Sequence, residues 1–296
     1  MNIKKYIITY VVNIMFHVKL NAGLGNRLFQ YASIKGFANK LNMGVHIMEV
    51  ENTFHDTHNS YKWFYDKIVN DINTQHIVNI DYEYNQPYQE HIGYNTEVDI
   101  FKNYKNIKIH GYFQYEHNFL HIKDELQYMF RESEDVKNLL DKYEESLPFK
   151  YKDATVLHIR LGDFINFPKH FVNLENYYKT CIDILYEKNK NINKDLNIII
   201  LCEDPQNIRH IYSSLLQYII SNNINGIIKE QNNNHSVEFD LYLMTRCKNI
   251  ICSNSTFAWW GAWLNTYPEK EVFIPNKWLN DRPYIVSMEG ATIIDI

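Results

Sequence analysis

The 296-residue chain has few cysteines and no pattern that would organise them. Its four cysteines, Cys181, Cys202, Cys247 and Cys252, form no CxxC pair, and such pairs are the usual signature of a zinc site or a redox motif. Cys202 and Cys252 stand in apolar, strand-like runs, where a reduced thiol acts as a small hydrophobic group. The sequence therefore indicates neither a zinc site nor a disulfide framework.

The chain also lacks an excess of positive charge. With 30 Lys and Arg against 35 Asp and Glu, its net charge is -5 at pH 7, which gives no field for holding a nucleic-acid backbone. We therefore expect no nucleic-acid partner. A small anionic ligand remains compatible with this charge, because it needs only a local positive pocket.

The apolar segment near the N-terminus is too short to cross a membrane. Tyr6 to Phe16 is about half of the ~20 residues that a spanning helix requires. Two lysines precede it, as in a signal peptide, but no small-residue cleavage site follows. We predict a cytoplasmic protein without a membrane span, whose first strand lies near Phe16 to Leu20. Met15 is a second candidate for the natural start.

The first half of the chain mixes clear and unclear patterns. A strand near Phe16 to Leu20, a glycine turn and a helix from Arg27 to Leu41 make one unit. Glu51 to Tyr104 carries no sustained period, and Tyr82 to Tyr94 is typical of an irregular loop. A strand at Ile107 to Phe113 and a mostly helical stretch then lead to Pro148.

After Pro148 strands and helices alternate. The expected strands are at 154–159, 196–201, 226–229 and 249–252, and the expected helices are at 174–188, 208–221, 236–247 and from 255 onward. This βαβ alternation predicts a parallel sheet with helices on both faces. We place a boundary near 148–152, which gives domains of residues 1–150 and 151–296.

A glycine turn, Gly23-Leu24-Gly25-Asn26, leads from the first strand into a helix. Glycines let a backbone approach a ligand closely, and the N-terminus of the following helix attracts anionic oxygens. Asn26 and Arg27 add donors that a plain turn does not need. The turn lacks the complete dinucleotide fingerprint, so a purely structural turn is the alternative.

The segment 158–164 follows the apolar run 154–157, so an arginine and two ionisable partners leave a predicted strand together. Ligands of parallel α/β sheets bind beyond the carboxyl ends of strands, and a guanidinium there can clamp a pyrophosphate. We predict that Arg160 neutralises phosphate, that His158 holds a nucleotide or orients the loop, and that Asp163 accepts a proton or fixes Arg160. The alternative is an Arg–Asp pair that only braces the turn.

Two more polar segments follow predicted strands. Ser255 or Thr256 can cap the next helix and leave its N–H groups for a phosphate, although a simple N-cap also explains them. Glu203 and Asp204 can accept hydrogen bonds from a guanine, or can cap the helix after Pro205. We assign three tryptophans to the core or the domain interface rather than to a sugar platform: Trp259, Trp260 and Trp263.

Together these segments resemble the α1,2-fucosyltransferase family, glycosyltransferase family 11, a group of inverting enzymes. The resemblance spans nearly the whole chain through GLGNRLFQYA at 23–32, GYFQ at 111–114, HIRLGDF at 158–164, CEDP at 202–205 and SNSTFAWWGAWL at 253–264. It implies an α/β protein of GT-B fold, with two Rossmann-like domains facing across a cleft. It also implies that the C-terminal domain holds most of GDP-fucose and the N-terminal domain holds the acceptor.

The resemblance further implies nine donor-binding residues in three groups. They are Gly25, Asn26 and Arg27 over the phosphate and fucose, Arg160, Ser255 and Thr256 at the diphosphate, and His158, Glu203 and Asp204 near guanosine. Leu161 stands where a second arginine is frequent and Arg27 where glutamine is frequent. Phe164 replaces a common tyrosine. These departures put donor affinity in question.

The implied reaction displaces GDP from GDP-β-L-fucose by the 2-hydroxyl of a terminal β-galactoside. The expected partners are GDP-fucose, as donor substrate, and a galactose-terminated glycan; no cofactor is expected. The sequence has no convincing DxD motif, so we expect Arg160 and helix termini to stabilise the leaving diphosphate in place of a metal ion.

The general base is left open by the sequence. Asp163 and His170 are candidates because both follow Arg160 on one loop. The functional alternatives are a fucosyltransferase with another acceptor or linkage, a transferase for another GDP-sugar, and a non-catalytic protein that binds a GDP-sugar or carbohydrate. The sequence does not determine the acceptor or the oligomeric state.

Overall fold

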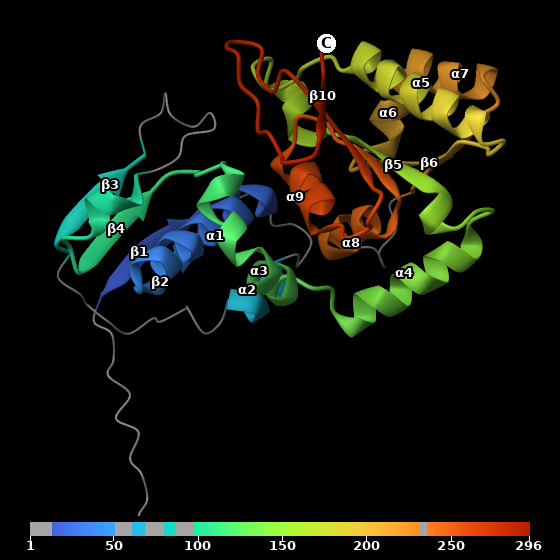
Figure 1. The fold of residues 1–296 in the computed structure, drawn as a ribbon. Coiled ribbons are helices and arrows are strands. Elements are labelled where there is room, and N and C mark those ends of the chain that lie inside the picture. Colours follow the sequence, from blue (N-terminus) through green and yellow to red (C-terminus); the bar gives the residue numbers. More distant parts are fainter. Residues whose placement is uncertain (1–13, 51–60, 69–79, 87–96, 231–235) are drawn as a thin grey trace, which may run out of the picture.

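The fold contains two parallel β-sheets with helices around them (Figure 1). The computed structural model describes residues 14–50, 61–68, 80–86, 97–230 and 236–296. The first sheet has the strand order β2-β1-β4-β3, and the second has the order β10-β9-β8-β5-β6-β7. Each strand pair within these ranges is parallel.

The first sheet belongs to the N-terminal part of the chain. Its strands are β1 (Met15–Leu20), β2 (Gly44–Val50), β3 (Tyr82–Asn85) and β4 (Asn106–His110), and its helices are α1 (Leu24–Leu41) and α2 (Tyr61–Ile68). The prediction of an irregular loop from Tyr82 is wrong for β3, which pairs with β4 at the sheet edge. A four-residue edge strand with alternating polar residues leaves too weak a pattern to detect. Residues 87–96 of that predicted loop lie outside the described ranges.

The second sheet confirms the predicted βαβ alternation. Its strands are β5 (Ala154–Ile159), β6 (Asn197–Cys202), β7 (Asn225–Ile228), β8 (Asn249–Ile251), β9 (Glu271–Pro275) and β10 (Thr292–Ile294). Its helices are α5 (Glu175–Asn191), α6 (Pro205–Ile211), α7 (Ser213–Ser221), α8 (Val237–Arg246) and α9 (Thr256–Leu264). The helix predicted at 208–221 is in fact two helices that meet at Tyr212.

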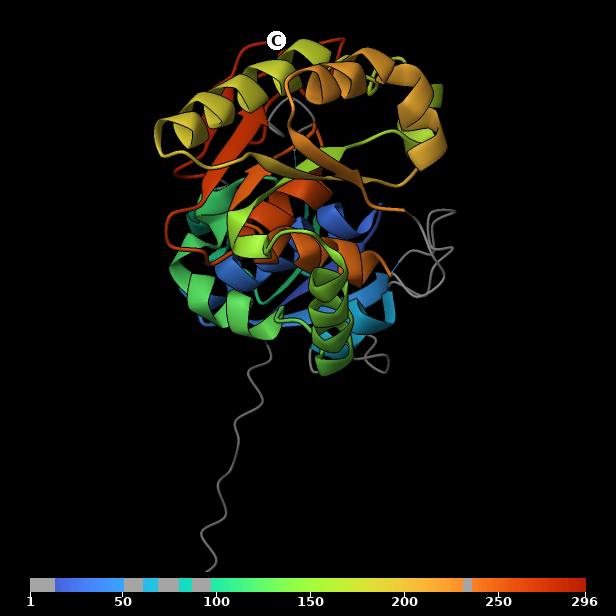
Figure 2. The ribbon, with the colours of Figure 1, turned by 90° about the vertical axis from the view of Figure 1, so that its right-hand side faces the viewer.

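Helices cover both faces of the second sheet, as Figure 2 shows. β5 and β6 are buried along their whole length, which is why they read as continuous apolar runs. Leu157 and Ile159 pack with α5, α6 and α7 on one face. Val156 and Leu201 belong to the cluster with α8 and α9 on the other.

Helix α9 joins the cores of the two halves. The predicted burial of its tryptophans is confirmed, since Trp259 and Trp260 are completely buried. The Phe29 ring of α1 lies 4.4 Å from the Trp259 ring centre and 5.2 Å from that of Trp260. Phe119, from the segment after the first sheet, stacks on Trp260 at 5.4 Å. One aromatic core therefore spans both sheets.

The segment between the sheets contains α3 (Lys123–Met129) and α4 (Glu134–Ser146). The first sheet ends at His110 and the second begins at Ala154, so the predicted boundary falls in the intervening chain. Helix α4 packs against α8 of the C-terminal half. In the described residues no helix is long and apolar enough to cross a membrane.

A buried carboxylate also connects the halves, and its removal should destabilise the protein. Glu116 accepts hydrogen bonds from Trp263 Nε1 at 2.8 Å and from the Glu289 backbone N–H at 2.7 Å. Hydrogen bonds to a charged acceptor each contribute about 1.5 to 3 kcal/mol. We expect Glu116→Ala to lower the free energy of unfolding by about 3 kcal/mol, measured by denaturant titration. Exposed Glu125 is the control, and Glu125→Ala should change it by less than ~0.5 kcal/mol; equal effects would contradict the inter-half role.

Candidate functional site

Arg160 lies at the carboxyl end of β5 between two carboxylates. Its Nη1 contacts Glu203 Oε1 at 2.8 Å, and its Nη2 donates to Asp163 Oδ1. The Phe164 ring lies 4.8 Å from the guanidinium carbon. The Arg160 side chain is 29% exposed, so the ion pairs fix the group without removing it from solvent. A guanidinium carries five N–H donors, which leaves donors for a phosphate.

Glu203 supports the whole turn after β5. Its Oε1 also accepts the Leu161 backbone N–H at 3.2 Å. Gly162 has a φ of +36°, and a Cβ there would lie 2.6 Å from Glu203 Oε1, so only glycine fits this conformation. Burial raises the pKa of Glu203, while the Arg160 charge opposes that rise. The structure thus places this predicted guanosine-binding carboxylate against Arg160.

His158 is tied to the loop after β8. Its Nδ1 lies 2.8 Å from Ser253 Oγ. Burial, with a smaller contribution from Arg160, lowers the pKa of His158 to about 3, so its imidazole is neutral at physiological pH. Because β5 and β8 are parallel neighbours, this contact holds together the two polar loops that follow them.

The N-terminus of α9 lies in the second of these loops. Ser255 is its N-cap, and its Oγ accepts the Phe257 backbone N–H at 3.3 Å. Thr256 is the first helical residue. The first N–H groups of a helix attract anions. By contrast, Asp204 caps α6 by accepting the Asn207 N–H at 3.0 Å. Of the two roles predicted for it, a contact with guanine and a helix cap, the structure shows the cap.

The first turn of α1 packs directly on the first turn of α9. A Cβ on Gly25 would lie 2.5 Å from Phe257 N and 2.6 Å from Thr256 Oγ1. Only glycine permits this approach. The sequence motifs 23–32 and 253–264, which are more than 200 residues apart, therefore bring two helix N-termini from different halves together.

The next two residues of α1 have different environments. Arg27 is completely buried, so the predicted contact with a donor phosphate would require its side chain to move. Asn26 is partly exposed and its Oδ1 accepts a hydrogen bond from Gln114 Nε2 at 2.7 Å. Gln114 belongs to the motif 111–114, for which the sequence indicated no individual role. This contact aims the Asn26 amide.

Replacement of Gln114 should reveal whether Asn26 is held in position. If Asn26 contacts the expected donor GDP-fucose, Gln114→Ala should weaken binding of that donor about fivefold, because one neutral hydrogen bond contributes about 1 kcal/mol. Gln114→Glu should be worse, because a carboxylate repels both Asn26 Oδ1 and the donor phosphates. Isothermal titration calorimetry measures both affinities. Equal binding by Gln114→Glu and the parent chain would show that the contact does not serve the site.

The loop after β5 brings the rings of Phe164 and His170 together, and the Asp163 carboxylate acts electrostatically on this imidazole. The Phe164 ring centre lies 5.3 Å from that of His170. Burial lowers the pKa of His170, Lys169 and Arg282 lower it further, and Asp163 and Asp281 oppose the shift. The partly exposed imidazole is therefore neutral near pH 7 and able to accept a proton.

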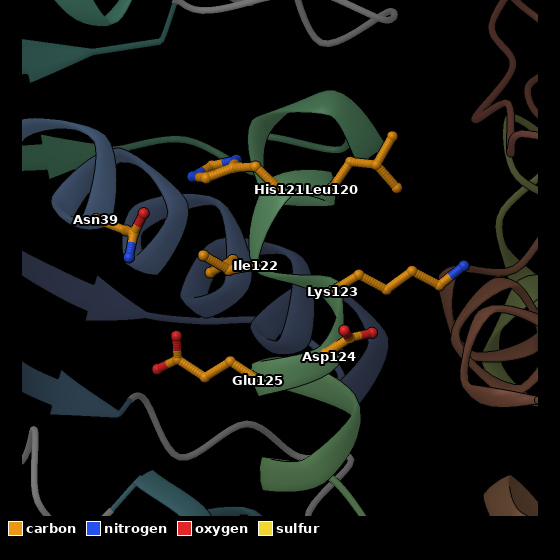
Figure 3. A pocket seen from close by; sticks show the side chains of 7 residues that line it. All are labelled: Asn39, Leu120, His121, Ile122, Lys123, Asp124 and Glu125. Carbon is orange, nitrogen blue, oxygen red and sulfur yellow. The ribbon is translucent and has the colours of Figure 1, made fainter.

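One pocket lies away from this arrangement. A pocket of about 390 Å³ is lined by Asn39, Leu120, His121, Ile122, Lys123, Asp124 and Glu125 (Figure 3). Asn39 lies near the end of α1, 14 residues or about 20 Å along the helix from Gly25. Among the residues that the structure describes, no group of three or more His, Cys, Asp or Glu side chains is arranged to hold a metal ion.

Comparison with protein families and curated proteins gives consistent matches. The family model described as Glycosyl transferase family 11 matches residues 3–292. An Escherichia coli protein named alpha-1,2-colitosyltransferase is 25% identical over 287 residues, covering 88% of this chain and 91% of that protein. The E. coli O-antigen biosynthesis glycosyltransferase WbnK is 30% identical over 162 residues, which cover 53% of this chain and 50% of that protein.

Solved structures share the fold at low sequence identity. POFUT1 in complex with GDP has a TM-score of 0.53 and 11% identity, with 88% of this chain and 98% of that chain covered. The fucosyltransferase NodZ from Bradyrhizobium has a TM-score of 0.52 and 14% identity, with coverages of 84% and 93%. These fucosyltransferases have the GT-B fold, and the parallel sheets described above confirm the predicted fold class.

Proposed function

Because this chain belongs to glycosyltransferase family 11, we propose that it transfers L-fucose from GDP-β-L-fucose to the 2-hydroxyl of a terminal β-galactoside. The observation that carries the donor site is Arg160, fixed by Asp163 and Glu203 and partly exposed. It stands at the carboxyl end of β5, whose neighbour β8 leads into the N-terminus of α9. The Arg160 guanidinium and the N-terminus of α9 both attract negative charge, so together they suit a diphosphate leaving group.

In the proposed reaction the acceptor oxygen forms a bond to fucose C1 as the bond from C1 to the diphosphate oxygen breaks. GDP leaves with the electron pair, and attack from the opposite face converts the β-linked donor into an α-linked product. Charge accumulates on the diphosphate in the transition state. N–H donors already oriented by Glu203 and Asp163 stabilise that charge without reorganising. No step in this scheme requires a metal ion.

We assign proton acceptance to His170 rather than to Asp163. The Asp163 carboxylate is paired with Arg160, while the lowered pKa of His170 keeps its ring neutral, so that its free ring nitrogen can accept a proton. A general base must lie within reach of the hydroxyl proton, and it must be in a protonation state that can accept this proton. The neutral His170 ring can accept a proton, and His170 lies on the same loop as Asp163.

Asp163→Asn tests this division of roles. We expect GDP-fucose affinity to fall about tenfold, because the charged hydrogen bond that orients Arg160 is lost. Turnover at saturating donor should fall less than affinity does. Calorimetry and initial rates at several donor concentrations measure the two effects. Unchanged affinity with lost turnover would instead make Asp163 the base.

A closely related donor is the second candidate. The colitosyltransferase relative matches 88% of this chain, and colitose is L-fucose without its 3-hydroxyl. The two hypotheses share the diphosphate site and the linkage, and they differ only in the sugar pocket. Competition between GDP-fucose and GDP-colitose for the same acceptor separates them, because the ratio of their kcat/KM values defines the preferred donor.

The first test is an assay of the purified chain with GDP-fucose and lactose in the presence of EDTA. Release of GDP and an α1,2-linked product, identified by mass and linkage analysis, would support donor, linkage and metal independence together. If GDP-fucose binds without turnover, other acceptors must be screened. If neither GDP-fucose nor GDP-colitose binds, the proposed donor site is wrong.

A further inference from the structure

The loop between β5 and α5, residues 160–174, has a fixed backbone beside the proposed donor site. Near its middle, the Phe167 N–H donates to the Phe164 carbonyl at 2.9 Å, and the Phe167 carbonyl accepts from His170 N–H at 2.8 Å and Phe171 N–H at 3.0 Å. Both backbone polar groups of Phe167 are therefore hydrogen-bonded within the loop. This pattern defines a compact turn rather than an extended connection.

A segment near the C-terminus anchors the same loop from outside. Asn280 Nδ2 donates to the carbonyls of Pro168 and Phe171, both at 2.8 Å, and the Asn280 N–H donates to the Lys169 carbonyl at 2.9 Å. Lys169 also pairs with Asp281 at 3.1 Å. Three hydrogen bonds from one residue therefore hold the part of the turn that directly follows Phe167.

A second anchor connects the loop to the motif at α9. Asn254 Nδ2 donates to the His170 carbonyl at 2.9 Å and to the Trp278 carbonyl at 3.0 Å. Asn254 directly precedes Ser255, the N-cap of α9. The turn around Phe167 is therefore positioned against the proposed phosphate site itself, and its geometry depends on three separate parts of the chain.

On this rigid turn the Phe167 side chain is 53% exposed. Its ring centre is 6.4 Å from that of His170 in an edge-on arrangement. Phe164, in contrast, already covers Arg160. Neighbouring side chains thus connect the proposed phosphate ligand to the exposed ring. Phe164 contacts Arg160 and His170, and His170, the assigned base, contacts Phe167. What sets this ring apart from other exposed apolar side chains is its place on a hydrogen-bonded turn beside the proposed base, because a ligand packing there would meet a backbone that is already ordered.

We propose that Phe167 forms an acceptor subsite, on which the apolar C–H face of the acceptor sugar packs while its hydroxyl faces His170. This inference rests on the proposed function and adds a contribution of the C-terminal half to acceptor recognition. β-Galactose presents three ring C–H groups on one face, which complements an aromatic ring. The negative face of the ring attracts these C–H groups, and burial of both surfaces adds a hydrophobic contribution.

The test compares Phe167→Ala with Phe167→Tyr in assays with GDP-fucose and lactose. We expect Phe167→Ala to raise the acceptor KM about tenfold and to leave the GDP-fucose Kd unchanged, because only one stacking surface is removed. Phe167→Tyr keeps the ring and should retain the parent KM within about twofold. Tyr128→Ala removes a more exposed aromatic residue, 70% exposed on α3, and should leave both constants unchanged.

Four outcomes separate this inference from the proposed function. An unchanged acceptor KM in Phe167→Ala would overturn the subsite while leaving the enzyme assignment intact. If the parent chain uses no β-galactoside, the proposed acceptor class fails, and binding to a glycan array with GDP present then tests the subsite. Selective loss of the bound glycans by Phe167→Ala would support it, and equal binding by both chains would overturn it.

Discussion

Arg160→Ala should reduce kcat/KM by at least about 10² to 10³, because removing one donor aimed at a developing anion typically costs that much. This substitution removes the guanidinium that contacts both Asp163 and Glu203. Two carboxylates would then face the incoming diphosphate with no guanidinium between them. We therefore expect the GDP-fucose Kd to rise as well as kcat to fall.

Arg160→Lys should not restore the activity. A guanidinium contacts Glu203 and Asp163 through different nitrogens and still offers further N–H groups. A single ammonium cannot reproduce this planar arrangement. We expect Arg160→Lys to stay at least about tenfold below the parent kcat/KM.

Arg209→Ala provides the matched control for loss of an arginine. Arg209 pairs with Glu230, and both side chains are largely exposed at 45% and 60%. Exposed ion pairs contribute little, so binding and turnover should remain at the parent values. Steady-state rates, calorimetry with GDP-fucose and thermal unfolding should be recorded for all three variants. A folded Arg160→Ala chain with parent turnover would contradict the assignment of Arg160.

The sequence predicted the C-terminal sheet more accurately than the N-terminal one. β5 and β6 are buried on both faces, so they appear as unbroken apolar runs between helices. β2 was not anticipated, since its sequence GVHIMEV mixes polar and apolar residues, and the second half of the strand is exposed. β10 has only three residues, and its pairing with β9 depends on tertiary contact.

The sequence indicated which residues stand at the ends of the strands, but it did not indicate their contacts. The position of Arg160 after a buried strand indicated a phosphate ligand, and the structure does place it at the carboxyl end of β5. Its pairing with Glu203 could not be predicted, because the two residues are 43 positions apart and the meeting depends on strand register. The same holds for Gln114 and Asn26, which come from different elements and meet only in the fold.

The local sequence also did not indicate the burial or the long-range contacts of some residues. The sequence indicated Arg27 as a donor ligand from its place after the glycine turn, and the structure buries its side chain completely. Asn280 belongs to no motif that the sequence indicated, although it anchors the β5–α5 loop through three hydrogen bonds. Such residues have no local signature, because a polar side chain in a loop usually faces solvent.

His170→Asn should reduce kcat by about 10² to 10⁴, the usual contribution of a general base, with the GDP-fucose Kd unchanged. The neutral imidazole is the active form, and burial lowers the pKa of His170 below its ordinary value of 6.5. The kcat of the parent enzyme should therefore increase with pH as His170 loses its proton, and should become constant above the shifted pKa. His170→Asn should lack this acidic limb, which a pH profile of kcat from initial rates will show.

Substitution of two neighbouring charged residues can shift the acidic limb of the kcat profile along the pH axis while His170 itself stays unchanged. Asp281 raises the pKa of His170 and Lys169 lowers it, and these two side chains pair with each other at 3.1 Å. Asp281→Asn should therefore move the limb to lower pH, and Lys169→Gln should move it to higher pH. A structural role for His170 would give a loss of activity but no opposite displacement in the two variants. If both variants retain the parent dependence of kcat on pH, the acidic limb does not come from His170, and another group accepts the proton.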